Sequence, residues 1–320
     1  MTKIVHSEQA AAEGLQKSVV TIGNFDGMHI GHQAIFETAV REARERDALP
    51  VALTFEPHPE AFFRPDDAPL RLSPPPYKYE LMGACGVEWV VSLPFDAALA
   101  NCSPEEFVER ILAEKLGAVH VVVGEDFRFG KKRAGDTDSL QRLGAAVGMS
   151  TTVASFVEWD GEPVSSTRIR AAVADGEMAS VETMLNRPYR LYGEVVAGEQ
   201  RGRKLGFPTA NLDVVDMASP PSGVYITTLG RADQEQWTAI TNIGTRPTFD
   251  DGEQTVETFI LDDAVDDDLD LYGDAVELDI FRRVRGEREF ESPEQLVAQI
   301  QRDIEEARAF FAREDFDGGR

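Results

Sequence analysis

Apolar and polar positions alternate in two different ways along the chain, and the first way occupies the N-terminal half. Short continuous apolar runs, typical of strands buried on both faces, are separated by longer stretches with apolar residues at helical spacing. The expected strands are Ser18–Gly23, Val51–Phe55, Trp89–Leu93 and Val119–Gly124, and the expected helices are Gly31–Arg46, Ser103–Leu116 and Asp136–Val147. Strands that alternate with helices predict a parallel, Rossmann-like α/β sheet.

The second pattern begins near Leu185–Tyr189, where short Val-, Thr- and Tyr-rich strands are divided by Gly and Pro turns. The expected strands are Leu191–Ala197, Gly223–Leu229, Trp237–Ile243, Thr255–Leu261 and Ala275–Phe281. A last helix is expected over Pro293–Ala312, with Ser292 as its N-cap. The sequence thus predicts an α/β Rossmann-like domain (residues 1–185), followed by a small antiparallel β-barrel domain with a C-terminal helix (residues 186–320).

Length and composition agree with this division. A chain of 320 residues exceeds the usual size of one hydrophobic core, and 42% hydrophobic residues suffice for two globular domains. No apolar run approaches the length that spans a bilayer, and the N-terminus lacks the pattern of a secretory signal, so we expect a cytoplasmic protein. The two cysteines, Cys85 and Cys102, are expected to be thiols that pack in the interior.

The formal net charge of −25 argues against nucleic acid or an anionic membrane as a partner, because the mean field of the protein would repel a polyanion. It does not argue against ATP, which needs only a local positive potential. A small anionic ligand therefore remains compatible with the composition.

The segment Gly23–His32 is the first with candidate chemistry. A strand leads into a glycine-containing turn and then into the start of a helix, whose N-terminal amides favour negative charge. His29 and His32 are three residues apart, so both imidazoles could flank a polyphosphate. The alternative is a pair of zinc ligands or surface histidines, but no third His or Cys stands at structural-zinc spacing.

This segment resembles the His-x-Gly-His signature of nucleotidylyltransferases. Three further segments, Thr54–Pro59, Gly124–Gly130 and Ser165–Arg170, resemble the flavin-nucleotide adenylyltransferase module of bifunctional prokaryotic riboflavin kinase/FAD synthetases. The resemblance implies that His29 and His32 act on the ATP phosphates as the catalytic pair. The other phosphate-site residues that it implies are Gly23, Phe25, Asp26, Gly31, Ser165, Ser166, Thr167 and Arg168.

Residues Ser165–Arg170 also support an anion site on physical grounds, because hydroxyls and amides at a helix start stand beside an arginine. A plain capped helix would explain the same three hydroxyl residues. Phenylalanines near the first motif could line a flavin pocket, although an isolated Phe is more often a core residue. The implied flavin-binding residues of this domain are Phe62, Asp126 and Phe127, with Phe55, Phe63 and Phe129 as further candidates for the pocket.

The second motif spans Gly193–Gly198 and Gly202–Asn211, and it resembles the phosphate loop and Pro-Thr-Ala-Asn signature of riboflavin kinases. It lacks the spacing of a P-loop, and a Gly/Pro turn between barrel strands is the alternative. The resemblance implies phosphate binding by Gly198, Gly202, Lys204 and Gly206, Mg²⁺ ligation by Thr209 and Asn211, proton abstraction by Glu257 and flavin binding by Arg285.

Together the motifs predict a bifunctional enzyme that makes FMN from riboflavin and FAD from FMN, with ATP and Mg²⁺ in both steps. The expected partners are the flavins and ATP, with no nucleic acid and no membrane. Two other interpretations remain open: an enzyme that keeps only one of the two activities, and a flavin-binding sensor that has lost catalysis.

Overall fold

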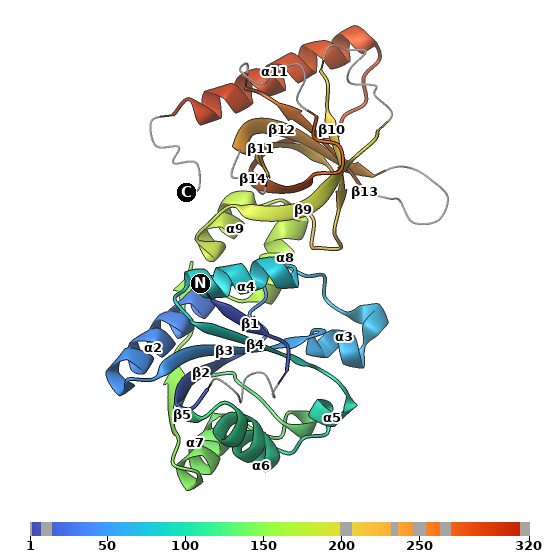
Figure 1. Ribbon diagram of the computed structural model, residues 1–320. Helices are drawn as coiled ribbons and strands as arrows, with labels where there is room; N and C mark the ends of the chain where they lie inside the picture. Colours follow the sequence, from blue (N-terminus) through green and yellow to red (C-terminus); the bar gives the residue numbers. More distant parts are fainter. Residues whose placement is uncertain are drawn as a thin grey trace. The chain divides into compact units, whose positions relative to one another are not determined.

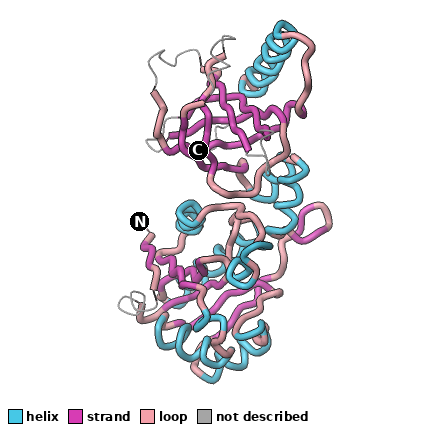
Figure 2. Tube along the Cα trace, turned by 90° about the vertical axis from the view of Figure 1, so that its right-hand side faces the viewer, coloured by secondary structure: helices cyan, strands magenta, loops and turns pink. Residues whose placement is uncertain are grey.

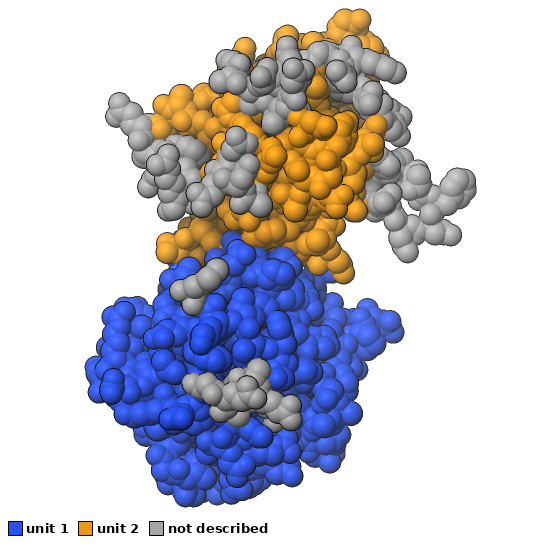
Figure 3. Space-filling view, in the orientation of Figure 1, with its two compact units in different colours: residues 1–166 blue, residues 167–320 orange. Residues whose placement is uncertain are grey.

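The computed structural model describes residues 2–7, 15–198, 207–231, 236–245, 254–262 and 270–313. It divides into two compact units, Met1–Ser166 and Thr167–Arg320 (Figure 3). Helices α8 (Ser166–Asp175) and α9 (Met178–Leu185) lie almost wholly in the second unit, together with the barrel. The boundary at residues 185/186 stays a prediction about the functional domains.

The first unit is built on a six-stranded parallel sheet with the order β1-β4-β3-β2-β5-β6 (Figure 1). Its strands are β1 (Lys3–Val5), β2 (Ser18–Ile22), β3 (Leu49–Glu56), β4 (Trp89–Pro94), β5 (Ala118–Gly124) and β6 (Ser150–Ala154). Its helices are α2 (Ile30–Arg46), α3 (Pro59–Phe63), α4 (Pro75–Ala84), α5 (Ala97–Ala100), α6 (Pro104–Glu106), a π-helix (Phe107–Lys115) and α7 (Thr137–Ala146), with a small hairpin of β7 (Glu158–Trp159) and β8 (Glu162–Pro163). Short 3₁₀ turns occupy Pro65–Asp67 and Lys131–Arg133.

Both faces of this sheet are covered, as continuous apolar runs require. On β2, Val20 packs with the π-helix residues Val108 and Ile111 in the main core cluster. Its neighbour Val19 points to the opposite face and packs with Ala39 and Ala43 of α2. The expected parallel α/β fold of this unit is therefore confirmed.

The second unit contains a closed antiparallel barrel with the strand order β10-β13-β12-β11-β14-β9, whose strands are drawn in magenta in Figure 2. The strands are β9 (Tyr189–Val196), β10 (Ala210–Val214), β11 (Gly223–Arg231), β12 (Gln236–Thr245), β13 (Gln254–Ile260) and β14 (Ala275–Gly286), and helix α11 (Pro293–Phe311) follows them. Ser292 caps α11 by accepting a hydrogen bond from the Gln295 amide, as its position predicts. The expected barrel and terminal helix are confirmed.

Helix α11 packs on the outside of the barrel. Its Ala307 is fully buried in a cluster with Val224 and Ile226 of β11 and Ile240 of β12. Successive strand residues point to opposite faces, so Thr227 and Thr241 point to the other side, where their hydroxyls lie 2.8 Å apart with no exposed surface. This alternation fixes which residues of each strand share a face with α11.

Two smaller expectations concern the membrane and the cysteines. Among the residues that the structure describes, no helix combines the length and the apolar character needed to cross a bilayer. Cys102 is buried in the main core, and Cys85 is half-buried against a second cluster. Both cysteines pack in the interior, as the sequence indicates.

Candidate functional site

The first candidate site lies at the carboxyl ends of the parallel strands. From β2 the chain continues to β3, which lies on one side of β2 in the sheet. From β5 it continues to β6, which lies on the opposite side of the β2/β5 pair, so the strand order reverses between β2 and β5. Open parallel sheets bind ligands in the crevice at such a point. The loop Gly23–His29 follows β2, and the motif Gly124–Gly130 begins at the last residue of β5, so the fold brings these two motifs to one edge.

The loop after β2 has an unusual backbone. Phe25 and Met28 both have positive φ, at 52° and 40°, as does Gly27. The ring of Phe25 is buried edge-on between Phe36 and His32, with centroid distances of 4.8 and 5.3 Å. A Cβ on Gly23 would come within 2.8 Å of the Phe25 ring, so glycine is required there. Gly23 and Phe25 therefore shape the loop.

His29 and His32 are brought together at the start of α2. His29 is the N-cap residue, and its Nδ1 accepts a hydrogen bond from the His32 amide at 3.3 Å. The two rings stack with centroids 3.6 Å apart. A Cβ on Gly31 would approach the His29 ring at 3.1 Å, so Gly31 leaves room for the stacked pair. Two imidazoles at a helix N-terminus suit an anionic ligand.

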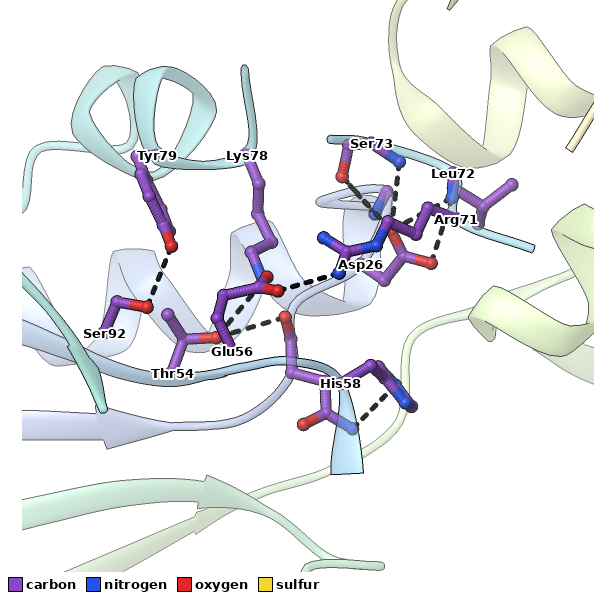
Figure 4. Close-up of polar contacts among 12 residues, drawn as sticks. Asp26, Thr54, Glu56, His58, Arg71, Leu72, Ser73, Lys78, Tyr79 and Ser92 are labelled. Atoms are coloured by element: carbon purple, nitrogen blue, oxygen red, sulfur yellow. Dashed lines mark hydrogen bonds and ion pairs between the residues drawn. The ribbon is translucent and has the colours of Figure 1, made fainter. Parts of the chain in front are cut away.

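Asp26 has a structural contact that the sequence does not reveal. Its carboxylate is buried and accepts hydrogen bonds from the amides of Leu72 and Ser73, each at 3.0 Å (Figure 4). The backbone carbonyl of Asp26 accepts a further hydrogen bond from Ser166 Oγ at 2.9 Å. We therefore expect any effect of Asp26 on nucleotide binding to pass through the loop that it fastens.

The remaining residues of the Ser165–Arg170 motif begin helix α8. Ser165 and Ser166 are half-buried at the end of the first unit, and Ser166 contacts the loop Gly23–His29 through Asp26. Thr167 is exposed and Arg168 is half-buried, and both belong to the second unit. The structure thus ties Ser166 to the first site.

The flavin candidates fall into two groups. Phe62 is 38% exposed and makes edge contacts with Phe63 and Phe95 beyond the ends of β3 and β4. Phe127 stacks at 5.5 Å on Phe129, which is buried in the main core, so the core interpretation holds for Phe129. Asp126 is exposed in the same loop after β5. The exposed aromatic surface around Phe62 suits a planar ligand.

Sequence reasoning missed a charged cluster at the end of β3. Glu56 forms ion pairs with two cations: its Oε1 lies 2.7 Å from Lys78 Nζ, and its Oε2 lies 2.9 Å from Arg71 Nη2 (Figure 4). Nearby, Asn24 Nδ2 lies 3.0 Å from His58 Nε2. Only the tertiary fold shows this cluster, because Arg71 and Lys78 have no recognisable spacing relative to the first motif.

In the second unit, the strand register places one residue of each strand in a continuous row on the face that carries α11. The row consists of Val196, Asn211, Glu257, Asn242, Val224 and Arg285. Three of these residues are predicted site residues, and the register makes Asn211 and Glu257 direct neighbours. The polar neighbour Asn242 was missed as a site residue, since its position opposite Glu257 depends on the pairing of β12 with β13.

Gly198 supports Asn211 directly. A Cβ at Gly198 would overlap the side-chain amide of Asn211, so the amide occupies the space that only glycine leaves free. Thr209 is half-buried just before β10. The predicted phosphate residues Gly202, Lys204 and Gly206 lie outside the described residues.

Arg285 is engaged by helix α11. Its Nε and Nη2 donate to Asp303 Oδ2 at 2.9 and 2.8 Å, and Asp303 is almost fully buried. Gln299 donates to the other oxygen of Asp303 at 2.7 Å. Arg285 therefore fastens α11 to β14 at the end of the row, whatever further role it has toward a ligand.

The described parts of the chain contain no cluster of side chains that could by itself enclose a metal ion. No group of three His, Cys, Asp or Glu side chains there could hold a metal ion. The row on the barrel offers oxygen atoms of another kind, the amide of Asn211 and the carboxylate of Glu257. Such oxygens suit a hard cation that completes its shell with water and phosphate.

The fold and the two sites define a class: a nucleotidylyltransferase-like α/β unit joined to a six-stranded barrel of the flavokinase type. The family description FAD synthetase matches residues 11–168, and the description riboflavin kinase matches residues 185–311. The chain belongs to the bifunctional riboflavin kinase/FMN adenylyltransferase family, which confirms the predicted family and its pair of enzymatic activities.

Relatives with this name align along nearly the whole chain. The protein from Escherichia coli K12 is 38% identical over 304 residues, which cover 95% of each chain. The protein from Pseudomonas fluorescens is 40% identical over 295 residues, or 92% of this chain and 93% of the relative. A Streptococcus pneumoniae crystal structure described as a macrolide-efflux protein has a TM-score of 0.85 at 30% identity, covers 96% of this chain and 98% of its own, and supports the fold.

Proposed function

We propose that the first unit converts FMN and ATP to FAD and pyrophosphate at the loop Gly23–His32. A phosphate oxygen of FMN attacks the α-phosphorus of ATP, and the bond from this phosphorus to the bridging oxygen of the β-phosphate breaks. Because the attacking phosphate is already anionic near neutral pH, no strong general base is needed. His29 and His32 orient the phosphates and balance their charge, which is the main requirement of such a step.

The second unit, in this proposal, transfers the γ-phosphoryl group of ATP to riboflavin. The attacking ribityl hydroxyl is neutral, so its proton has to leave during the transfer, and the Glu257 carboxylate accepts it. The products are FMN and ADP. Asn211 and Thr209 are the proposed Mg²⁺ ligands, because amide and hydroxyl oxygens suit this cation. When bound, Mg²⁺ would offset the charge that develops on the phosphates.

One observation carries this assignment: each unit has a polar site of its own. In the first unit the stacked His29 and His32 stand at the N-terminus of α2. In the second unit Asn211 and Glu257 are paired neighbours on the barrel. Two separate sites suit two successive ATP-dependent reactions.

Crossed variants test the assignment. His32→Ala is expected to lower the kcat for FAD formation from FMN by about 10²–10³-fold, the usual cost of losing one group that stabilises transition-state charge. Glu257→Gln is expected to lower riboflavin phosphorylation by roughly 10²–10⁴-fold, the usual contribution of general base catalysis. Each variant should keep the other activity, measured by chromatography of the flavin products. Equal loss of both activities in either variant would contradict the assignment.

A further inference from the structure

The ion-paired cluster of Glu56, Arg71 and Lys78, hereafter the Glu56 cluster, lies at the ligand edge of the first unit. Glu56 is the last residue of β3, and β3 is the direct neighbour of β2. The segment around it is tied to the loop Gly23–His29 at two further points. Thr54 Oγ1 donates to the carbonyl of Asn24 at 3.3 Å, and Asn24 contacts His58. The Glu56 cluster therefore borders the loop that leads to His29.

Arg71 is also connected to this loop from its own side. The two residues that follow it, Leu72 and Ser73, donate their amides to the Asp26 carboxylate. Ser73 Oγ in turn accepts a hydrogen bond from the Gly27 amide at 2.9 Å. The backbone beside Arg71 is thus fixed against the turn that precedes His29, and Figure 4 shows its guanidinium directed toward Glu56.

The three charged groups differ in exposure. The Lys78 side chain is 5% exposed, with its ammonium 2.7 Å from Glu56 Oε1 and 3.5 Å from Thr54 Oγ1. The Arg71 side chain is 33% exposed and contacts the other carboxylate oxygen. Lys78 is enclosed and already neutralises Glu56, so the cluster carries one positive charge in excess. The more exposed guanidinium presents that charge at the surface.

The Glu56 cluster carries this excess positive charge in a chain whose net charge is −25. The proposed adenylyl transfer needs it, because a flavin phosphate has to approach the polyphosphate of ATP, and both are anions. The two histidines are assigned to ATP, so the phosphate of FMN still lacks an assigned cationic partner among the residues that the structure describes. A guanidinium forms paired hydrogen bonds to phosphate and remains charged at any physiological pH.

On the basis of the proposed adenylyltransferase function, we propose that Arg71 binds the phosphate of FMN and thereby selects phosphorylated flavin over riboflavin in the first unit. Lys78 keeps Glu56 charge-balanced when the guanidinium turns to the substrate. Arg71 is in this account a substrate-binding residue for FMN and has no contact with ATP.

The test is the steady-state kinetics of FAD formation by the full chain, starting from FMN and ATP with Mg²⁺. Arg71→Met is expected to raise the KM for FMN by about tenfold or more, the usual effect of losing hydrogen bonds to a charged group. The KM for ATP should stay within a factor of two. Arg71→Lys should lie between the wild type and Arg71→Met, because lysine keeps the charge but not the paired donors.

Arg46→Met is the matched control. Arg46 has a similar side-chain exposure of 31% and is also paired with a glutamate, Glu42, but it lies in the last turn of α2, away from the ligand edge. Its substitution should leave the KM for FMN unchanged. An unchanged KM for FMN in Arg71→Met would overturn the inference. Equal rises in the KM for FMN and the KM for ATP would also overturn it, because they would show that Arg71 supports the loop and does not bind FMN. If the wild type itself formed no FAD from FMN, the proposed function would fail first, and the inference with it.

Discussion

His120 joins three elements of the first unit through one imidazole. It is almost fully buried on β5, with Nδ1 at 2.6 Å from Ser150 Oγ and Nε2 at 2.9 Å from Thr152 Oγ1, both on β6. Nε2 also lies 3.7 Å from Glu42 of α2. Burial lowers the pKa of His120, Arg46 lowers it further, and Glu42 opposes both. The neutral ring is therefore the form that the fold prefers.

This preference makes stability depend on pH. A histidine whose pKa is lowered in the folded state binds its proton more readily in the unfolded chain. Its contribution to the free energy of unfolding is therefore complete above the unfolded pKa near 6.5, and this contribution is lost as the pH falls below that value. We expect the thermal stability of the wild type, measured relative to His120→Asn, to decrease between about pH 7.5 and 5.5. A difference between the two proteins that stays constant over this range would contradict the prediction.

At the same scale, the sequence predicts which residue types take part in a site better than it predicts which residues touch one another. The pair His29 and His32 is recognisable because its spacing on a helix is local, and the structure stacks the two rings. Asp26 is different, because the amides that its carboxylate binds belong to Leu72 and Ser73, 46 and 47 positions later in the chain. No local pattern contains such a contact, so the fastening of the loop could not be predicted.

At the scale of elements, the strands buried on both faces were predictable from their continuous apolar runs. Strand β1, with three residues, and β6, which is Ser- and Thr-rich and mostly half-buried, carry no such signal and were missed. The expected helix Ser103–Leu116 is present, but most of it is the π-helix Phe107–Lys115. Its i→i+5 hydrogen bonds leave no mark in the apolar pattern of nine residues that would separate it from an α-helix. The register of the barrel, which aligns Asn211 with Glu257, depends on long-range pairing and could not be deduced.

The contact between Gly198 and Asn211 gives an element-scale prediction. Gly198→Ala should displace the Asn211 amide and lower riboflavin kinase activity by about 100-fold, since a misplacement near 1 Å at a reacting site has that effect. FAD formation from FMN should persist, because it belongs to the other unit. Both rates are measured on the same preparation.

Gly286→Ala is the matched control for this substitution. Gly286 also belongs to the barrel, but the nearest atom to its added Cβ would be Arg283 Nη2 at 3.5 Å, an ordinary contact. This variant should keep its kinase activity within a few-fold of the wild type. Kinase loss in Gly286→Ala as large as in Gly198→Ala would show that the barrel tolerates no added methyl group and would remove the special role of Gly198.

At the scale of the whole molecule, one chain carries two enzymatic activities that use the same two kinds of substrate, ATP and a flavin. Its net charge of −25 means that anionic substrates are attracted only by local groups. In the first unit these include the N-terminus of α2 and the Glu56 cluster. Composition argues against polyanionic partners, but it could not locate these groups.

The most direct test of the account is a chromatographic time course of the purified full chain with riboflavin, ATP and Mg²⁺, together with a parallel reaction that starts from FMN. We expect riboflavin to be converted first to FMN and then to FAD, and FMN alone to yield FAD with release of pyrophosphate. Accumulation of FMN without FAD would contradict the assignment of the His29/His32 site. Formation of FAD only from supplied FMN would contradict the assignment of the Asn211/Glu257 site. Flavin binding without any product would contradict both assignments.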